Sequence, residues 1–301
     1  MVVLPDTQLY AQDYPEIFDA QTQWIVEHKR SQNIAFALHE GDITNLNTPT
    51  QWENASRSLH MLDGHVPYAI VPGNHDIGPN GRAGTRDTLL NEFFPVSGFE
   101  SLPSFGGVFE EDRIDNSFHV FETGAGLWLV IALEFGPREE VVRWASRIVD
   151  EHADLPTIVV THAYLYSDNT RQSYDDRPDQ HWNPHEYGVA ELPGGVHDGE
   201  ELWNGLIRDH GNIVFVLSGH VLNDGLGRLS SRRDDGSVVH EILANYQMNE
   251  EGGAGYLRIM GLDPASTTVT VRSYSPYLDM YKTDDQNEFT VEIDSRWARP
   301  H

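Results

Sequence analysis

The chain has no cysteine among its 301 residues, which excludes disulfides, thiolate metal ligands and cysteine nucleophiles. Lysine is almost absent as well, because Lys29 and Lys282 are the only two and arginine supplies the rest of the 20 basic residues. No apolar run approaches the length of a membrane span.

Positively charged residues are also few. The 20 Lys+Arg stand against 47 Asp+Glu, which gives a formal net charge of −27. Such a surface repels polyanions, and proteins that bind the nucleic-acid backbone normally neutralise its phosphates with Lys and Arg. We therefore expect no nucleic acid polymer and no anionic membrane surface as a partner. A small phosphorylated molecule remains possible, because a metal site creates its own local positive field.

Hydrophobic residues make up 39% of the chain, enough for a sizeable core. No stretch rich in Pro, Gly or Ser divides the sequence, so we expect a single domain over residues 1–301. The first expected strand begins at Val2, which leaves no room for a signal peptide. The chain is then either cytoplasmic, or secreted or periplasmic with its leader removed. Oligomeric state leaves no trace in the sequence.

Five short apolar runs each lead to a residue that can bind a metal. The runs cover residues 2–5, 34–38, 68–71, 157–161 and 213–217, and the polar residues that follow them are Asp6, Asp42, Asn74, His162 and His220. Short runs rich in β-branched residues and bounded by Gly or Pro are typical of buried strands. In open α/β sheets, ligands bind beyond the carboxyl ends of the strands. The pattern predicts one sheet edge that gathers oxygen and nitrogen ligands around divalent metal.

Helical periodicity separates these strands, and short alternating runs fill the last third of the chain. The periodicity predicts helices over residues 15–31, 50–62, 138–152 and 198–210. Alternation predicts antiparallel strands over residues 226–232, 238–245, 255–262, 268–274 and 288–294. Together they predict an α/β (α+β) fold with two sheets flanked by helices.

The ordered blocks Asp6, Gly41-Asp42, Gly73-Asn74-His75-Asp76, His162 and Gly219-His220 resemble those of the calcineurin-like metallophosphoesterases. The Gly-Asn-His-Asp block is the most specific of them. The resemblance implies a four-layer αββα sandwich of two mixed sheets, with a dinuclear metal centre at the strand ends. It also implies a hydrolase of phosphate mono- or diesters.

The same residues make chemical sense as ligands. A carboxylate directly after Gly, Asp42, could bridge two cations. Together with Asn74, His162 and His220 it would complete four protein ligands for one metal, leaving room for water or substrate. Asp6 would serve the other metal. Water held between two cations loses a proton near neutral pH and becomes a hydroxide nucleophile.

Two further residues follow Asn74 in the most specific block. By similarity to the family, His75 would face the leaving-group oxygen as a proton donor or electrostatic stabiliser. Asp76 would then orient or charge the His75 imidazole. We take both as candidate catalytic residues.

The chain departs from the family at two positions that serve the same metal. Gln8 stands where the first block has His, and Leu222 stands where the last block has its second His. Gln8 offers a harder carbonyl oxygen, and Asn223 or Asp224 could substitute for the second imidazole. This predicts one tight metal and one loose metal. Oxygen-rich ligation at the loose site favours Mn²⁺, Mg²⁺ or Ca²⁺ over Zn²⁺. For the centre as a whole we expect Mn²⁺, with Fe, Zn²⁺, Mg²⁺ and Ca²⁺ as alternatives.

Residues 163–197 resist assignment and directly follow His162, so they form either a lid over the site or a solvent-exposed insertion. Candidate substrate-binding residues on loops are Arg82, Arg86, Tyr164, Arg171 and Trp182. Each could instead serve a surface salt bridge or anchor its own loop. The leading hypothesis is a phosphoesterase acting on a small or exposed ester. The alternatives are a metal- or phosphate-binding protein that has lost turnover, and a hydrolase of another ester such as a sulfate or phosphonate.

Overall fold

A computed structural model describes residues 1–263 and 266–297. Its first sheet has seven strands in the order β13-β12-β11-β1-β2-β3, with β14 paired to β12. These strands are β1 (Val2–Leu4), β2 (Ala37–His39), β3 (Tyr68–Ile70), β11 (Leu257–Leu262), β12 (Thr268–Ser275), β13 (Met280–Lys282) and β14 (Glu288–Glu292). Strands β1, β2 and β3 are parallel to one another, so their carboxyl ends lie at one edge of the sheet.

The second sheet also has seven strands, in the order β4-β5-β6-β7-β8-β10-β9. They are β4 (Phe105–Glu110), β5 (Arg113–Thr123), β6 (Gly126–Leu133), β7 (Thr157–Thr161), β8 (Ile213–Ser218), β9 (Leu226–Arg232) and β10 (Val238–Ala244). Strands β6, β7, β8 and β10 run parallel to their neighbours in this set. Four carboxyl ends therefore meet at one edge of this sheet too.

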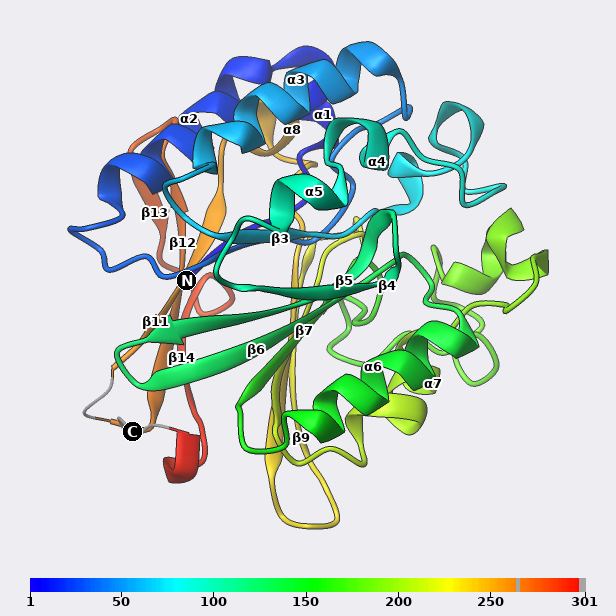
Figure 1. Ribbon diagram of the computed structural model, residues 1–301, viewed down its shortest axis with the longest axis vertical. Coiled ribbons are helices and arrows are strands. Elements are labelled where there is room, and N and C mark those ends of the chain that lie inside the picture. Colours follow the sequence, from blue (N-terminus) through cyan, green and yellow to red (C-terminus); the bar gives the residue numbers. More distant parts are fainter. Residues whose placement is uncertain (264–265, 298–301) are drawn as a thin grey trace.

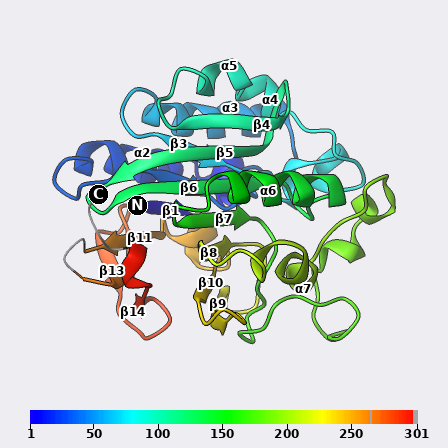
Figure 2. The same cartoon turned by 60° about the horizontal axis from the view of Figure 1, so that its bottom comes forward.

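Helices cover the outer faces of the two sheets, and Figures 1 and 2 show α2 and α3 on one side of the molecule and α6 and α7 on another. The α-helices of the described residues are α1 (Gln8–Asp13), α2 (Pro15–His28), α3 (Pro49–Leu59), α4 (Leu90–Phe93), α5 (Val96–Phe99), α6 (Glu139–Glu151), α7 (Gly199–Leu202) and α8 (Glu250–Gly253). A π-helical turn, Trp203–Ile207, extends α7.

The core divides into layers because side chains alternate along each strand. In β1, Val2 and Leu4 pack with the residues of α2 and α3. Val3, which lies between them, packs instead in the cluster that joins the two sheets. The same alternation separates Leu129 from Val130 in β6. Helix, sheet, sheet and helix thus form the expected four layers, and the predicted fold class is confirmed.

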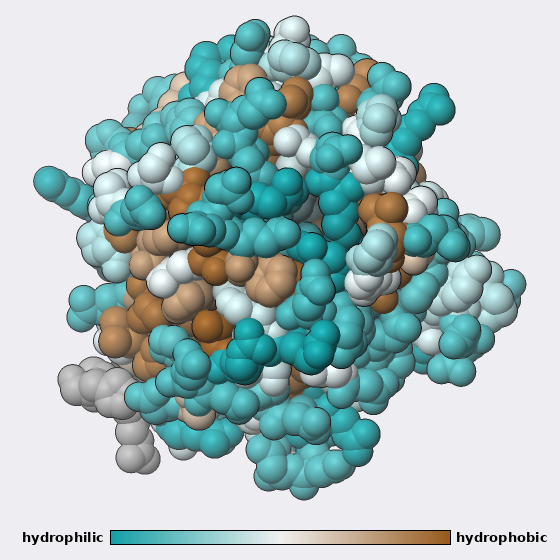
Figure 3. Space-filling view, turned by 45° about the vertical axis from the view of Figure 1, so that its right-hand side comes forward, coloured by the Kyte–Doolittle hydropathy of each residue, from teal (hydrophilic) through white to brown (hydrophobic). Residues whose placement is uncertain are grey.

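Two features differ from the sequence-based expectations. The pattern of the last third predicted antiparallel pairing throughout, yet β10 is parallel to β8 and antiparallel only to β9. The long strands β5 and β6 were not predicted. No helix in the described part of the chain is long and apolar enough to cross a bilayer. The surface in Figure 3 is mostly hydrophilic, in keeping with the acidic composition.

Candidate metal centre

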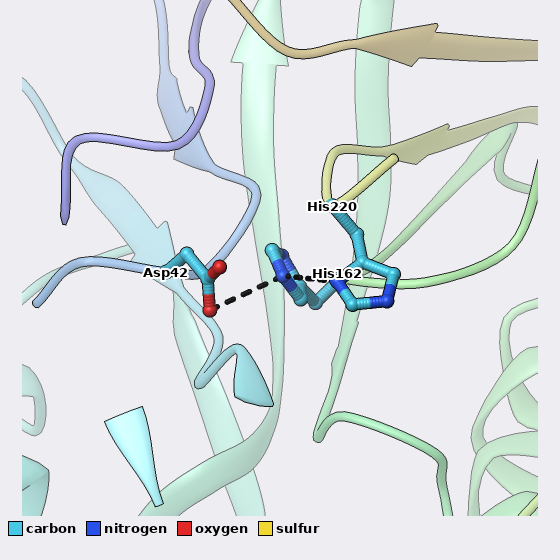
Figure 4. Close-up of side chains that lie close together, drawn as sticks. All are labelled: Asp42, His162 and His220. Carbon is cyan, nitrogen blue, oxygen red and sulfur yellow. Dashed lines mark hydrogen bonds and ion pairs between the residues drawn. The ribbon is translucent and has the colours of Figure 1, made fainter. Parts of the chain in front are cut away.

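The carboxyl ends of the two sheets face each other and bring the strand-end residues together. Figure 4 shows that the side chains of Asp42, His162 and His220 lie close together. Their ligand atoms are all within 4.8 Å of one another. Asp6 Oδ1 lies 4.0 Å from His162 Nε2. All four side chains are buried. The clustering expected from the sequence is therefore present, with residues drawn from β1, β2, β7 and β8.

Two glycines make this convergence possible. A Cβ atom at Gly73 would overlap with the Asp42 carboxylate, and a Cβ atom at Gly219 would overlap with the Asp6 carboxylate. A side chain at either position would therefore push a carboxylate out of the cluster. This explains why glycine precedes Asn74 and His220 in the sequence.

The tautomers of the two histidines follow from their carbonyl partners. His162 Nδ1 lies 2.8 Å from the Glu40 carbonyl oxygen, and His220 Nε2 lies 2.6 Å from the Trp182 carbonyl oxygen. Because a carbonyl only accepts, these two nitrogens carry hydrogen. The remaining nitrogens, His162 Nε2 and His220 Nδ1, face each other at 3.1 Å. Asp42 Oδ1 lies 3.2 Å from His162 Nε2, so three lone-pair donors surround one point.

The charges within the cluster favour a proton on His162. Burial lowers the pKa of His162, but the charge of Asp42 and a hydrogen bond to it outweigh burial and raise the pKa to about 9. Burial and the charge of His162 lower the pKa of His220 to about 3. Burial raises the pKa of Asp6 to about 7. A divalent cation could replace that proton, since metal ligation requires unprotonated imidazole and ionised carboxylate.

Two carboxamide oxygens also indicate a metal site. Asn74 Oδ1 and Gln8 Oε1 are both buried, and neither has a hydrogen-bond partner among the described residues. Leaving such an acceptor buried and unpaired costs about 1–3 kcal/mol. A cation offers each oxygen the partner that the protein does not. The residues present therefore fit a divalent metal centre.

The His75-Asp76 pair differs in part from the expectation. His75 Nδ1 contacts the Asn45 carbonyl at 2.8 Å, so it is Nε2 that is left for a substrate. The Asp76 carboxylate does not orient this imidazole. It accepts hydrogen bonds from the backbone N–H groups of Gly73, Ile43 and Thr44 and from the Thr44 hydroxyl. Asp76 thus fixes the two loops that carry Asp42 and Asn74.

Three of the expected substrate contacts are taken up by the protein itself. Tyr164 is fully buried, so it cannot stack on a ligand ring. Arg171 donates to the Tyr164 hydroxyl and forms an ion pair with Glu241 at 2.7 Å. Arg86 donates to three backbone carbonyls, including that of Phe135, and lies 3.4 Å from Glu134. These side chains anchor loops, because Arg171 and Arg86 are paired with carboxylates far away in the sequence and Tyr164 accepts a hydrogen bond from Arg171.

Two other predicted site residues, Arg82 and Asn223, lie on the surface. Arg82 is exposed, and no hydrogen bond or ion pair of its guanidinium occurs within residues 1–263 and 266–297. It follows Gly81, which packs against the His75 backbone. Asn223 is exposed and donates to the Ser167 hydroxyl at 2.8 Å. It therefore does not replace the missing imidazole in this structure.

The segment 163–197 packs against the site and is held by several short elements rather than extended into solvent. It supplies the Trp182 carbonyl to His220, while the half-buried Trp182 ring stacks on Tyr166. Tyr187 lies edge-on to Phe135, and its ring is 5.9 Å from that of His220. Burial and the charge of Asp42 raise the Tyr187 pKa. This geometry favours a wall of the site over a distant insertion.

Asn245 was missed by the sequence analysis. Its side-chain amide donates to Asp6 Oδ1 at 3.1 Å, and the backbone N–H of His220 donates to the same oxygen at 3.0 Å. The signal was present, because Asn245 also follows an apolar strand. It was overlooked because the last third was taken as wholly antiparallel, which did not place the carboxyl end of β10 at this edge.

Comparison with known proteins agrees with this architecture. The family model for calcineurin-like phosphoesterase matches residues 2–224. YvnB of Bacillus subtilis (strain 168) is 30% identical over 306 residues, covering 97% of this chain. The chain spans 21% of that relative's length.

Two solved structures share the fold at low identity. Purple acid phosphatase PPD1 from yellow lupin (Lupinus luteus) seeds aligns over 99% of this chain and 54% of its own, with 15% identity and a TM-score of 0.54. GAP50, the anchor in the inner membrane complex of Plasmodium, aligns over 97% of this chain and 87% of its own, with 11% identity and a TM-score of 0.51. With the family model covering most of its length and the strand-end residues gathered as described, the chain belongs to the calcineurin-like phosphoesterase family.

Proposed function

We propose that this chain is a metal-dependent hydrolase of small phosphate mono- or diesters. The observation that carries the proposal is the convergence of the Asp42, His162 and His220 donor atoms on one point. The unpaired oxygen of Asn74 adds a fourth donor. We also propose that residues 1–301 act as one domain, since the cluster between the sheets joins Val3 to Phe289.

The residues have distinct tasks in this proposal. Asp42, Asn74, His162 and His220 would hold one cation, and Asp6 with Asp42 would hold a second. When bound, divalent cations lower the pKa of water and offset charge on the phosphoryl group. The carbonyls of Glu40 and Trp182 hold the hydrogens of the other two ring nitrogens, which orients His162 Nε2 and His220 Nδ1 toward a cation. Such orientation of ligands through their other nitrogen is common in metal sites.

His75 is the candidate proton donor to the leaving group. Its Nδ1–H donates to the Asn45 carbonyl, so the ring is held in one orientation with Nε2 left to interact. His75 is only half-buried, whereas its neighbours Asn74 and Asp76 are buried. A substrate can therefore reach the imidazole while the ligands behind it stay protected. General acid catalysis of this kind contributes about 10²–10⁴-fold to a rate.

The surroundings of the site favour a small substrate. Segment 163–197 contacts His220 through the Trp182 carbonyl and places Tyr187 beside it, so one side of the site is walled. The net charge of −27 disfavours a long polyanion. Arg82 is an exposed cation next to the loop that carries His75, and it could meet a substrate phosphate.

A second candidate function is binding of metal or phosphate without turnover. The observation that favours it is the loss of two imidazoles, at Gln8 and Leu222, on the Asp6 side of the centre. The fold alone does not decide between the two, since it is shared with a phosphatase and with a protein described as an anchor. Hydrolysis of a different ester, such as a sulfate or phosphonate, is a third outcome of the same experiment.

The test is a screen of nitrophenyl phosphate mono- and diesters, with a nitrophenyl sulfate and a phosphonate alongside, using chelator-treated protein with and without added Mn²⁺. We expect Mn²⁺-dependent release of nitrophenol from a phosphate ester and its loss in His162→Ala. Turnover of the sulfate alone would favour the other-ester hydrolase. Retained metal binding with no turnover of any ester would favour the binding protein and overturn the proposal.

A further inference from the structure

The carboxyl end of β10 brings a further loop to the metal edge. In the parallel pairing of β10 with β8, Leu243 lies beside Ser218. The residues that follow Ala244 therefore emerge level with Gly219 and His220. Asn245 confirms this position, because its side-chain amide donates to Asp6 Oδ1. From here the chain crosses from the second sheet to β11 of the first sheet.

Gln247 lies in this crossing and is 8% exposed. Its backbone N–H donates to Asn245 Oδ1 at 2.9 Å, which ties it to the residue that holds Asp6. Its side-chain oxygen, Oε1, is buried and has no hydrogen-bond partner in the part of the chain that the structure describes. A few residues later the loop packs on α1, where a Cβ atom at Gly252 would touch Leu9.

Gln247 thus belongs to a loop that touches Asp6 at one end and the start of α1 at the other. Helix α1 begins at Gln8, whose Oε1 is likewise buried and unpaired. Two buried, unpaired carboxamide oxygens thus belong to residues that adjoin Asp6: Gln8 lies two residues after it, and Gln247 is tied to it through Asn245. Buried acceptors are nearly always paired, and a cation held at Asp6 would give both oxygens a partner.

We propose that Gln8 and Gln247 bind a second divalent cation together with Asp6 and Asp42, giving a site made of oxygen ligands only. This inference rests on the proposed metal centre, and it assigns the two ligands that replace the imidazoles absent from this chain. Leu222 cannot ligate, and Asn223 is engaged with Ser167. Gln247 supplies the missing donor from another strand end.

The ligand types set the metal preference of the two halves. Carboxylate and carboxamide oxygens are hard ligands that suit Mn²⁺, Mg²⁺ and Ca²⁺, whereas the imidazoles of His162 and His220 suit Zn²⁺ and Fe as well. The centre is therefore asymmetric, and the oxygen site should exchange its cation more readily. The oxygen site should also discriminate poorly between Mn²⁺ and Mg²⁺.

The experiment counts Mn²⁺ bound to chelator-treated protein, by electron paramagnetic resonance of free Mn²⁺ and by calorimetry. We expect about two sites per chain, with the weaker one lost or weakened at least about tenfold in Gln247→Leu and in Gln8→Leu. Gln247→Glu should retain or tighten the weaker site, because it keeps an oxygen ligand and adds charge. Gln23→Leu, on the exposed face of α2, is the matched control and should bind like the parent protein.

Two results would overturn the inference: a single Mn²⁺ site in the parent protein, or an unchanged weaker site in Gln247→Leu that folds normally by circular dichroism. If Gln247→Leu does not fold, Gln247→Glu decides, and a weakened site in that variant would contradict the proposal. Binding is measured without substrate, so the result is separable from activity. Two sites that depend on Gln247 in a protein that hydrolyses no ester would uphold the inference and refute the proposed function.

Discussion

His162 Nε2 and His220 Nδ1 lie 3.1 Å apart, each with its other ring nitrogen donating to a backbone carbonyl. In their neutral forms the two rings would therefore present lone pairs to each other inside a buried site. Such a contact is repulsive unless a positive charge lies between the donors. The metal-free protein provides that charge as a proton on His162, and the metal-bound protein would provide it as a cation.

This relationship predicts that metal binding releases protons and strengthens as pH rises. The pKa of His162 is raised to about 9 and that of Asp6 to about 7, so at about pH 7 a cation must displace protons to bind. Below these values the apparent affinity should fall by up to about tenfold per pH unit for each proton displaced. Calorimetry in two buffers with different ionisation enthalpies measures the protons released.

The free energy of unfolding of the metal-free protein should depend on pH through His162 and Asp6. A raised pKa means that the folded state holds a proton more tightly than the unfolded chain does. The contribution of His162 is thus present below 6.5, the ordinary pKa of histidine, and is lost as pH rises through about 9. The contribution of Asp6 is present below 3.8 and is lost as pH rises through about 7. Added Mn²⁺ should therefore raise the melting temperature more at about pH 8 than at about pH 5; an equal rise at both would contradict this account.

His75→Ala should lower kcat by about 10²–10⁴-fold while leaving the metal content unchanged. The expected reason is loss of the imidazole that is positioned by the Asn45 carbonyl and lies outside the set of clustered ligand atoms. His60→Ala is a suitable control, because His60 is a surface residue paired with Asp63. The substrate should decide the size of the effect, since a nitrophenolate leaving group needs less protonation than an alkoxide. A loss of bound metal in His75→Ala would instead indicate a structural role.

Asp76→Ala should act mainly on stability. The carboxylate accepts three backbone N–H groups and one hydroxyl in a fully buried position. Each buried donor left without a partner costs about 1–3 kcal/mol, so the free energy of unfolding should fall by at least about 3 kcal/mol. Urea denaturation measures the change. A stable Asp76→Ala protein with low kcat would restore the catalytic role expected from the sequence.

The sequence predicted the centre of the site better than its rim. Asp42, His162 and His220 could be placed together because strand ends of parallel sheets share an edge, and because glycine leaves room for the neighbouring carboxylates. Their metal binding stays a prediction. The position of Arg171, which donates to Tyr164, could not be predicted, because its partner Glu241 lies 70 residues away and no local sequence pattern reveals the pair.

In the fold, too, features set by neighbouring residues could be predicted and features set by residues far away in the sequence could not. The helix at Glu139–Glu151 was evident from its periodicity. The direction of β10 relative to β8 could not be predicted, because alternation of apolar and polar residues is the same whether the neighbouring strand is parallel or antiparallel. That single ambiguity concealed Asn245 and Gln247 at the edge of the site.

Arg82 and Arg86 provide a matched pair of substitutions on one loop. Arg86 donates to three backbone carbonyls and contacts the buried Glu134, so Arg86→Ala should destabilise the fold by about 3–5 kcal/mol. Arg82 is exposed and has no such contacts in the described structure, so Arg82→Ala should leave stability within about 0.5 kcal/mol. If Arg82 meets the substrate phosphate, KM should rise several-fold with little change in kcat. Unchanged KM would remove Arg82 from the binding site.

Gly73→Ala tests whether the close approach of the loops is required. A Cβ atom at this position would overlap with the Asp42 carboxylate, so the carboxylate or the loop must move and the ligand cluster must open. Gly98→Ala is the matched control, because a Cβ atom at Gly98 meets nothing within 4 Å. We expect Gly73→Ala to lose most Mn²⁺ binding and Gly98→Ala to retain it. Since distortion near a reacting centre also lowers rates steeply, activity should fall with metal content in Gly73→Ala. Full metal binding in that variant would show that Asp42 is not held where the structure places it.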